Sequence, residues 1–314
     1  MNIERKRQHI LDSFFISVSK YKEVIRYASA QKNVIFRVAY NIHRFGTRYV
    51  FYHSSRLRIP IFVEHIHATL FFGRGMLLPA RDIGGSVLSM YGISPHKSER
   101  RLTLWLIKNL KESDIFYDVG AHLGYYTALS EELVMDGEVH AFEANKYLCT
   151  YLEKNFLKSS CVHVSRSAVA DHIGEVDFYD ASDTDDSSTS SRFHLSQSSI
   201  TPSKVTAITL DEYVRLGNIP PTVLKLDIEG GESDAILGAL EVIKIYKPRI
   251  AMDVWGGDMG RKYSSPAVKK LQDYGYQAFA LDGNGDISKE SIADPVMSIS
   301  DTSEGARGNF VFLI

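Results

Sequence analysis

The segment 115–127, Ile-Phe-Tyr-Asp-Val-Gly-Ala-His-Leu-Gly-Tyr-Tyr-Thr, constrains the fold of this chain more than any other. An apolar run, predicted to be a strand, enters a tight turn with two glycines, and a helix is predicted to open after it. A second apolar run, 138–142, follows and leads directly into the acid Glu143. This order is typical of a nucleoside-binding unit, because glycines let the backbone approach the ligand and the acid accepts hydrogen bonds from ribose hydroxyls.

The rest of the chain alternates between the same two patterns. The predicted strands are 115–119, 138–142, 162–165, 175–179, 222–227, 249–254, 276–281 and 309–314. The predicted helices are 99–110, 125–134, 146–156, 233–245 and one that has Ser265 as its N-cap, Pro266 in its first turn and its end near Gly275. Strand–helix alternation predicts a parallel sheet with helices on both faces, and the last two strands predict a hairpin that adds one antiparallel strand.

The N-terminal region differs from the rest in charge. Residues 1–58 carry twelve Lys or Arg against three Asp or Glu, whereas the whole chain has a net charge of −2. Apolar residues at near-helical spacing predict one to three amphipathic helices before about residue 50. We expect a helical cap with a solvated basic face, and the alternative is a surface that meets anionic lipid or an anionic glycan carrier. The predicted organisation is a basic helical extension (1–55), a prelude of short strands and turns packed on the main domain (56–98), and the main domain (99–314).

Composition argues against several classes of protein. A net charge of −2 speaks against general nucleic-acid binding, and two cysteines, Cys149 and Cys161, fit a reducing compartment without a disulfide framework. We see no transmembrane stretch or secretory signal, so we expect a cytoplasmic protein, peripheral on the inner membrane face if the basic extension binds lipid.

The serine- and aspartate-rich segment 180–203 is predicted to be a surface loop, with a lid over the ligand as the alternative. The oligomeric state stays open.

The turn at 118–124 departs from the dinucleotide-binding fingerprint, because Asp118 replaces its first glycine. A pyrophosphate prefers bare backbone amides at a helix N-terminus, and a carboxylate there would repel it. The same carboxylate would attract the ammonium group of S-adenosylmethionine, directly or through water. A sulfonium methyl donor is therefore favoured over a nicotinamide cofactor, with Glu143 as the ribose ligand.

Five segments together resemble the FkbM-type S-adenosylmethionine-dependent methyltransferases. They are Asp-Val-Gly-Ala-His-Leu-Gly-Tyr-Tyr-Thr (118–127), Ala-Phe-Glu (141–143), Ser-Ala-Val-Ala-Asp (167–171), Thr-Leu-Asp (209–211) and Lys-Leu-Asp-Ile-Glu-Gly-Gly-Glu (225–232). The resemblance covers residues 90–281, approximately, and agrees in order and spacing. It implies a class I methyltransferase fold, with a seven-stranded, mostly parallel sheet and an antiparallel last strand. Many relatives act as O-methyltransferases on sugars, polysaccharides or natural-product hydroxyls.

The resemblance also implies a set of cofactor-binding residues around the methionine part, the ribose and the adenine. This set is Asp118, Gly120, His122, Gly124, Thr127, Glu143, Ala144, Ser167, Ala168 and Asp227. Within it, the turn residues from 118 to 124 would line the methionine part, Glu143 would hold the ribose, and residues 167–168 would lie beside the adenine. Two positions depart from the family pattern, because Ala144 stands where relatives have Pro and Asp253 where they commonly have Glu.

Methyl transfer to a hydroxyl requires alignment and an acceptor for the hydroxyl proton. Asp227 ends a predicted central strand beside the expected methyl group, and Glu229 follows on the next turn. One of these two is predicted to be the base or the group that orients the substrate. Lys225 and Glu232 are expected to form structural ion pairs. Oxygen ligands of this density also suit Mg²⁺, at Asp227, Glu229 and Asp253, but the metal-free interpretation is favoured.

The sequence thus predicts an S-adenosylmethionine-dependent methyltransferase that acts on a hydroxyl of a sugar, a glycan or another small-molecule acceptor. Two alternatives stay open at this point. One is a nicotinamide-dependent oxidoreductase, against which Asp118 speaks. The other is a non-catalytic methyltransferase fold that binds a membrane or a partner through the basic N-terminus, against which the intact acids speak.

Overall fold

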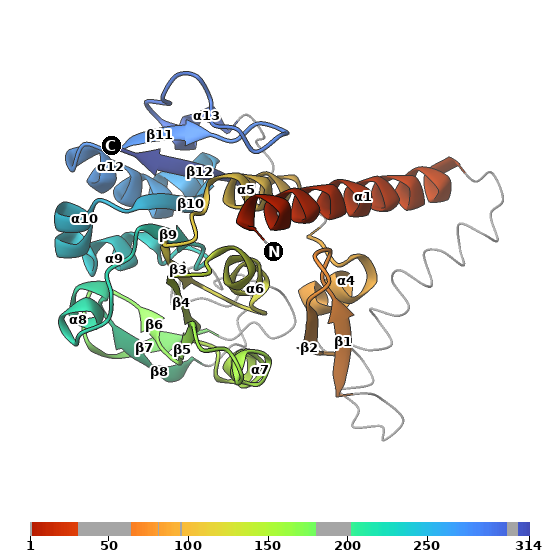
Figure 1. Ribbon diagram of the computed structural model, residues 1–314. Coiled ribbons are helices and arrows are strands. Elements are labelled where there is room, and N and C mark those ends of the chain that lie inside the picture. Colours follow the sequence, from red (N-terminus) through yellow and green to blue (C-terminus); the bar gives the residue numbers. More distant parts are fainter. Residues whose placement is uncertain (1, 31–63, 81, 95, 180–201, 300–306) are drawn as a thin grey trace. The chain divides into compact units, whose positions relative to one another are not determined.

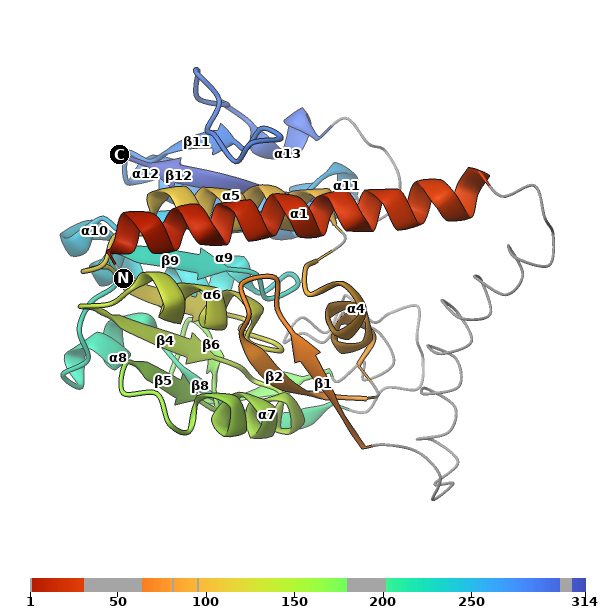
Figure 2. The ribbon, with the colours of Figure 1, turned by 45° about the vertical axis from the view of Figure 1, so that its right-hand side comes forward.

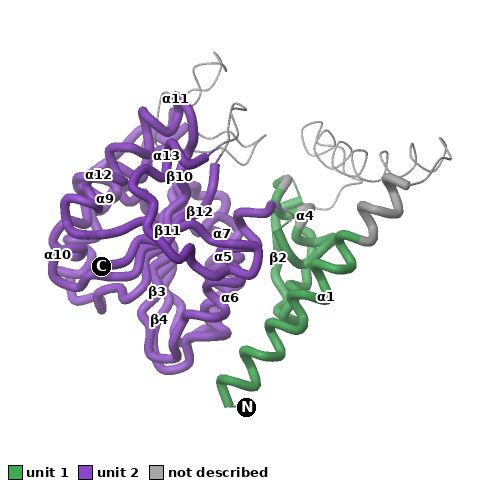
Figure 3. Tube along the Cα trace, turned by 90° about the horizontal axis from the view of Figure 1, so that it is seen from above, with its two compact units in different colours: residues 1–95, 182–185 green, residues 96–181, 186–314 purple. Residues whose placement is uncertain are grey.

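The computed structural model describes residues 2–30, 64–80, 82–94, 96–179, 202–299 and 307–314. The chain divides into two compact units, coloured green and purple in Figure 3, with a boundary between Pro95 and His96. This boundary lies close to the predicted start of the main domain at residue 99. Most of the segment 180–203, for which a loop or lid was predicted, lies outside the described residues.

The first unit combines one long helix with a small hairpin and a short helix. Its elements are α1 (Ile3–Ala30), β1 (His65–Thr69), β2 (Gly75–Pro79) and α4 (Ile83–Tyr91), and β1 pairs with β2 in antiparallel register. Phe14 of α1 is 1% exposed and packs edge-on against Phe71, with 5.3 Å between ring centroids. The N-terminal helix is therefore confirmed, and any further helices predicted before about residue 50 lie outside the described residues.

Helix α4 corrects one sequence prediction. Residues 56–98 were predicted to form short strands and turns, but Gly84 and Gly85 lie inside this helix. The helix forms because Asp82 acts as an N-cap, its carboxylate accepting a hydrogen bond of 2.7 Å from the amide of Gly85. Among the helices that the structure describes, none has the length and apolar character needed to cross a bilayer.

The second unit is built on a seven-stranded sheet in the order β11-β12-β10-β9-β3-β4-β5 (Figure 1). Its strands are β3 (Ile115–Val119), β4 (Glu138–Phe142), β5 (Val162–Ser165), β9 (Val223–Leu226), β10 (Arg249–Trp255), β11 (Gln277–Ala280) and β12 (Arg307–Leu313). Strand β12 runs antiparallel to both β10 and β11, whereas the pairs from β10 to β5 are parallel. The predicted sheet, mostly parallel with an antiparallel last strand, is confirmed.

Helices cover both faces of this sheet (Figures 1 and 2). One face carries α5 (Lys97–Asn109), α6 (Tyr125–Leu133) and α7 (Lys146–Phe156). The other carries α8 (Leu210–Arg215), α9 (Glu232–Leu237), α10 (Leu240–Tyr246) and α12 (Ser265–Asp273). Shorter helical segments are α11 (Gly257–Met259), a π-helical turn (Gly260–Ser264) and α13 (Pro295–Ser298). With both faces covered, β3 and β9 are buried along their whole length.

Two helix predictions need correction. The single helix predicted over 233–245 is interrupted between α9 and α10 at Gly238. A Cβ atom there would lie 1.9 Å from the carbonyl oxygen of Ala170, so the glycine permits a close backbone approach that bends the chain. Ser265, predicted as an N-cap, is instead the first residue of α12, and the preceding Ser264 accepts a hydrogen bond from the amide of Trp255 at 2.9 Å.

A second sheet of three short strands was largely missed by the sequence analysis. Its order is β6-β8-β7, with bounds Ala168–Val169, Ser203–Ile208 and Gly174–Phe178. Only β7 was predicted. Strand β8 alternates exposed and buried residues only over positions 204–207, it directly follows the polar segment, and it carries only three apolar residues. Its partners therefore stabilise it more than its own sequence does.

Candidate active site

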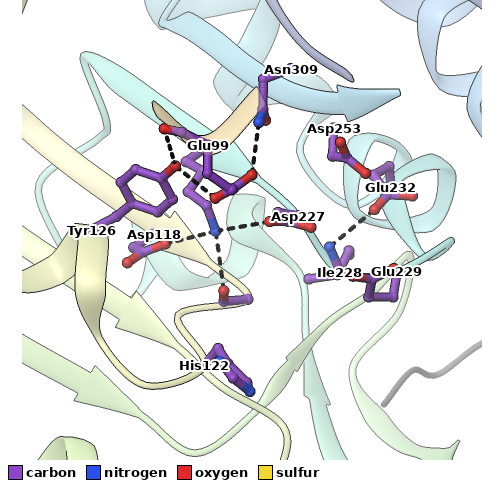
Figure 4. A network of polar contacts seen from close by, with 12 residues as sticks. Glu99, Asp118, His122, Tyr126, Asp227, Ile228, Glu229, Glu232, Asp253 and Asn309 are labelled. Atoms are coloured by element: carbon purple, nitrogen blue, oxygen red, sulfur yellow. Dashed lines mark hydrogen bonds and ion pairs between the residues drawn. The ribbon is translucent and has the colours of Figure 1, made fainter. Parts of the chain in front are cut away.

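Charged side chains gather where the central parallel strands end (Figure 4). Asp118 lies near the end of β3 and pairs in register with Lys225 of β9. Glu143 follows β4, Asp227 follows β9, and Asp253 lies in β10. The carboxyl ends of parallel strands share one edge of a sheet, which is where ligands bind in folds of this kind.

Lys225 is the cation at the centre of this edge. Its side chain is buried, and Nζ lies 3.1 Å from Oδ1 of Asp118, 3.8 Å from Oδ2 of Asp227 and 5.3 Å from the ring centroid of Tyr126. Nζ also donates a hydrogen bond of 3.1 Å to the carbonyl of Gly120. Burial acts to lower the pKa of Lys225, but the carboxylates of Asp118 and Asp227 outweigh it and raise that pKa. The ammonium group is therefore charged and ion-paired.

Asp118 is fully buried and its oxygens face the protein. Oδ2 accepts a hydrogen bond of 2.7 Å from the hydroxyl of Thr127, and Oδ1 faces Lys225. The structure thus brings together two predicted cofactor residues, Asp118 and Thr127, and ties the end of β3 to α6. The charge that was expected to attract a ligand ammonium is offset here by Lys225. A direct role of Asp118 toward a methyl donor stays a prediction.

The glycine turn is as tight as the sequence indicated. Gly120 has a φ of 79°, and a Cβ atom there would lie 1.9 Å from the carbonyl oxygen of Asp227. Gly124, with a φ of 82°, precedes the first residue of α6. The amides of Gly120 and Ala121 both donate to the carbonyl of Phe142 at 3.0 Å. These contacts hold the turn between the ends of β4 and β9.

Glu143 holds the next loop and keeps spare hydrogen-bonding capacity. Oε2 accepts from the amide of His122 and Oε1 from the amide of Asn145, each at 2.8 Å. Burial raises the pKa of Glu143, and the two amides and His122 act against that rise. A carboxylate has about four acceptor sites, so about two remain after these two bonds. The residue therefore fits the ribose role that the sequence predicted.

The predicted adenine-side residues follow β5, beside Glu143. The amide of Glu143 donates to the carbonyl of Ser165 at 3.1 Å, which brings the ends of β4 and β5 together. The hydroxyl of Ser167 lies 2.7 Å from that of Ser165. Ala168 begins β6, and the partly buried Ala144 packs against the small apolar cluster that contains Ala168. Both alanines and Ser167 thus lie near the predicted ribose ligand.

Glu232 stabilises the turn after β9 through backbone amides. Its side chain is buried, Oε1 accepts from the amide of Ile228 at 3.0 Å, and Oε2 accepts from the amide of Gly230 at 3.0 Å. A structural role was expected for Glu232, but through an ion pair. The contacts of the structure are amide hydrogen bonds instead, and they position Glu229, whose φ of 53° lies in the left-handed region.

Arg307 is a site residue that the sequence analysis missed. It begins β12, opposite Trp255 of β10, and its guanidinium lies 2.5 Å from Oε1 of Glu229 and 3.9 Å from Oδ2 of Asp253. It also lies 5.2 Å from the ring centroid of Trp255. The only signal of this role in the sequence was a basic residue, Arg307, just before the predicted strand 309–314. A cation therefore already lies between two of the three carboxylates considered for Mg²⁺.

A second missed group connects three elements beside Lys225 (Figure 4). The hydroxyl of Tyr126 in α6 donates to Oε2 of Glu99 in α5 at 2.7 Å. Oε1 of the same carboxylate accepts a hydrogen bond of 2.9 Å from the side-chain amide (Nδ2) of Asn309 in β12. Tyr126 also lies under Lys225, so this network positions the ring that contacts the buried cation.

The two acids beside Arg307 have raised pKa values. Burial raises the pKa of Glu229 to about 8, although Arg307 acts in the opposite direction. Burial also raises the pKa of Asp253, and the nearby Asp227 adds to that rise. Oδ2 of Asp253 has no hydrogen-bond partner among the described residues. A carboxyl group that titrates near neutral pH, at a substrate-binding edge, is suited to proton transfer.

These pKa values predict that the free energy of unfolding falls as the pH rises from about 5 to 8. In the unfolded chain Glu229 loses its proton near pH 4.5, whereas in the folded protein it keeps the proton until about pH 8. Between these values the folded state binds more protons, so a higher pH favours unfolding. The substitution Glu229→Gln should make this fall smaller by at least about 1 kcal/mol, which is close to the free energy that corresponds to a shift of one pKa unit. Urea unfolding of both proteins at pH 5 and pH 8 measures it, and an equal fall would contradict the raised pKa.

Comparison with known proteins identifies the family. The sequence model described as the methyltransferase FkbM domain matches residues 118–278, just over half of the chain. The chain belongs to the FkbM methyltransferase family. This confirms the resemblance, and membership of a methyltransferase family sets aside the nicotinamide alternative. No curated protein sequence matches the chain.

Solved structures similar to this FkbM-family protein are distant. A methyltransferase FkbM from Methylobacillus flagellatus KT has 15% identity and a TM-score of 0.42, covering 66% of this chain and 44% of its own. A precorrin-6y C5,15-methyltransferase from Geobacter metallireducens GS-15 has 13% identity and a TM-score of 0.37, covering 69% and 87%. Fibrillarin from Aeropyrum pernix, solved with bound S-adenosyl-L-methionine, has 11% identity and a TM-score of 0.38, covering 68% and 74%. The match thus spans less than half of the Methylobacillus protein.

Proposed function

We propose that this protein transfers a methyl group from S-adenosylmethionine to a hydroxyl of a sugar, a glycan or another small-molecule acceptor. The observation that carries the proposal is the carboxylate of Glu143. It lies at the end of β4, it is fixed by two backbone amides, and it keeps about two acceptor sites for the two ribose hydroxyls. The family supplies the reaction class, and the hydroxyl acceptor rests on the resemblance to O-methyltransferases.

The residues at this edge of the sheet fit such a donor. Glu143 would hold the ribose, the backbone of the turn from Gly120 to Gly124 would lie along the methionine part, and Ser167 would lie beside the adenine. When bound, S-adenosylmethionine supplies an electrophilic methyl group on a sulfonium. Lys225 is one cation beside two carboxylates, Asp118 and Asp227, so a net negative charge is left that suits a cationic ligand.

Asp227 is the residue best placed to take the hydroxyl proton. It directly follows a central strand, and its side chain is 25% exposed, whereas Glu229 is 12% exposed and paired with Arg307. Lys225, 3.8 Å away, keeps the carboxylate oriented at this edge of the sheet. In this scheme Asp227 accepts the proton of the acceptor hydroxyl or orients that hydroxyl. Glu229 and Arg307 set the charge around Asp227. The scheme needs no metal ion.

Glu143→Ala should weaken binding of S-adenosylhomocysteine about 10- to 100-fold, because each hydrogen bond to a charged group contributes about 1.5 to 3 kcal/mol. Calorimetric titration of the wild type and the variant measures this loss, with NAD as a ligand expected not to bind. Glu143→Gln, which keeps an acceptor oxygen for one amide, should lose less. Unchanged affinity in a folded Glu143→Ala protein would contradict the proposed ribose site.

The acceptor can be identified by turnover. Transfer of a labelled methyl group to nucleotide sugars, glycans and lipid-linked saccharides tests the proposed substrate class directly. Methylation of any hydroxyl in this panel supports the proposal. Donor binding without turnover on any acceptor would instead support the alternative of a non-catalytic methyltransferase fold.

Contact with an anionic membrane is a second proposal, carried by the exposed apolar residues of α1. Phe15 and Ile16 are 50% and 55% exposed on a helix whose first turns carry Arg5, Lys6 and Arg7. Such a helix suits the surface of an anionic bilayer. Flotation of the full chain with anionic but not with neutral vesicles, lost in a variant with the three basic residues changed to Glu, would support it.

A further inference from the structure

Three side chains with metal-binding atoms meet on strands β4 and β5, away from the active site. Glu138 and His140 lie two residues apart on β4, so both point to the same face of the sheet. His163 of β5 is the register partner of His140. Among the described residues, these three form the one group of His, Cys, Asp or Glu whose ligand atoms all lie within 4.8 Å of one another.

Two distances between these atoms are close to those around a tetrahedral zinc ion. Oε2 of Glu138 lies 3.1 Å from Nε2 of His140 and 3.4 Å from Nε2 of His163. Two ligands of a tetrahedral Zn²⁺ with bonds of about 2.0 to 2.1 Å are separated by about 3.3 Å. The two imidazole rings lie face to face, with 4.8 Å between their centroids. The side chains could therefore accept an ion with small adjustments.

The surroundings of His140 also suit a metal ligand. Its Nδ1 lies 2.9 Å from the hydroxyl of Tyr213 in α8, which can hold the ring with Nε2 directed at Glu138 and His163. The side chain of His163 is 47% exposed, so a fourth ligand could come from solvent.

We propose that Glu138, His140 and His163 bind a divalent ion of the zinc class, with water as the fourth ligand. Two His and one Glu are the ligand set of many zinc sites with one open position. Glu138 begins β4 and Glu143 follows its end, so the two carboxylates lie about 16 Å apart along the strand. This distance separates the ion from methyl transfer. The ion would instead connect the edge strand β5 to β4 and stabilise the sheet.

Zinc binding to the full-length, tag-free and chelator-treated protein tests the proposal, because a histidine tag would itself bind zinc. Isothermal titration with Zn²⁺ should show a site that His163→Ala weakens at least about tenfold. His172→Ala is the matched control, since His172 is also exposed and lies 2.7 Å from a carboxylate oxygen of Asp171. This control should bind zinc as the wild type does. Co²⁺ should give the visible absorption of a tetrahedral site in the wild type and not in His163→Ala.

Thermal unfolding provides a second measurement that does not depend on activity. Zinc should raise the Tm of the wild type and of His172→Ala, and should raise the Tm of His163→Ala and Glu138→Gln clearly less. Circular dichroism without metal establishes that each variant is folded. Equal zinc affinity in the wild type and His163→Ala, or no saturable binding by about 100 μM Zn²⁺, would overturn the proposal. The three residues would then form only a hydrogen-bonded group with Tyr213.

Discussion

Replacing Asp227 with Asn should reduce methyl transfer by about 10²- to 10⁴-fold, the usual contribution of a positioned general base. Asn has nearly the same shape and can still orient a hydroxyl, but it cannot accept the proton. Donor binding should change little, because the proposed ribose ligand is Glu143, on a different strand. The expected signature is therefore a low kcat with a nearly unchanged affinity for S-adenosylhomocysteine.

Two further variants show whether this effect belongs to Asp227. Asp177→Asn is the matched control, because Asp177 is an exposed aspartate that pairs with a lysine, Lys204, at 2.8 Å in the small sheet. It should keep the wild-type rate. Glu229→Gln separates the two candidate bases, since a greater loss there would transfer the role of base to Glu229. Wild-type turnover in Asp227→Asn would exclude Asp227 as the base.

Replacing Lys225 with Met should lower the free energy of unfolding by about 3 to 5 kcal/mol. Met keeps the length of the apolar stem but removes the charge that lies 3.1 Å from Asp118. Asp118 is fully buried, so its carboxylate would be left without a counter-charge in a region that excludes water. Urea unfolding followed by the fluorescence of the two tryptophans measures the loss.

A double variant tests the cause of that loss. Asp118→Asn removes the buried charge and keeps an oxygen that can accept from Thr127, 2.7 Å away in the wild type. Combined with Lys225→Met, it should recover at least half of the stability lost by Lys225→Met alone. A double variant as unstable as the sum of the two single variants would show that the ion pair is not the source of the effect.

The sequence predicted well what depends on local patterns. Strands β3, β4 and β5 and helix α7 have the bounds that apolar periodicity indicated, because a core strand and an amphipathic helix each leave a period in the sequence. The glycine turn and Glu143 were found for a related reason, since a tight turn and a strand-end acid have fixed spacing. The family resemblance added the order of the motifs, which the family match supports.

The contacts missed by the sequence analysis depend on register between distant segments. Arg307 reaches Glu229 from 78 positions away, and only the pairing of β12 with β10 brings it there. The short strand β8 and the break at Gly238 were missed because they are decided by the distant segments of the chain that they pack against, and not by the local sequence. Register between distant segments is set by how their apolar faces and turns fit together, so ion pairs that depend on it are predicted less well than single helices and strands.

The hydrogen bond between Asn309 and Glu99 spans 210 positions and has a consequence for synthesis. Domains form from the N-terminal side as the chain leaves the ribosome. The glycine turn and the acids after β9 emerge well before Arg307 and Asn309 do. A nascent chain can therefore build most of the central sheet while Glu229 still lacks its arginine and Tyr126 its supporting network. The residues proposed to bind the methyl donor would thus be in place before those that set the charge around the proposed acceptor.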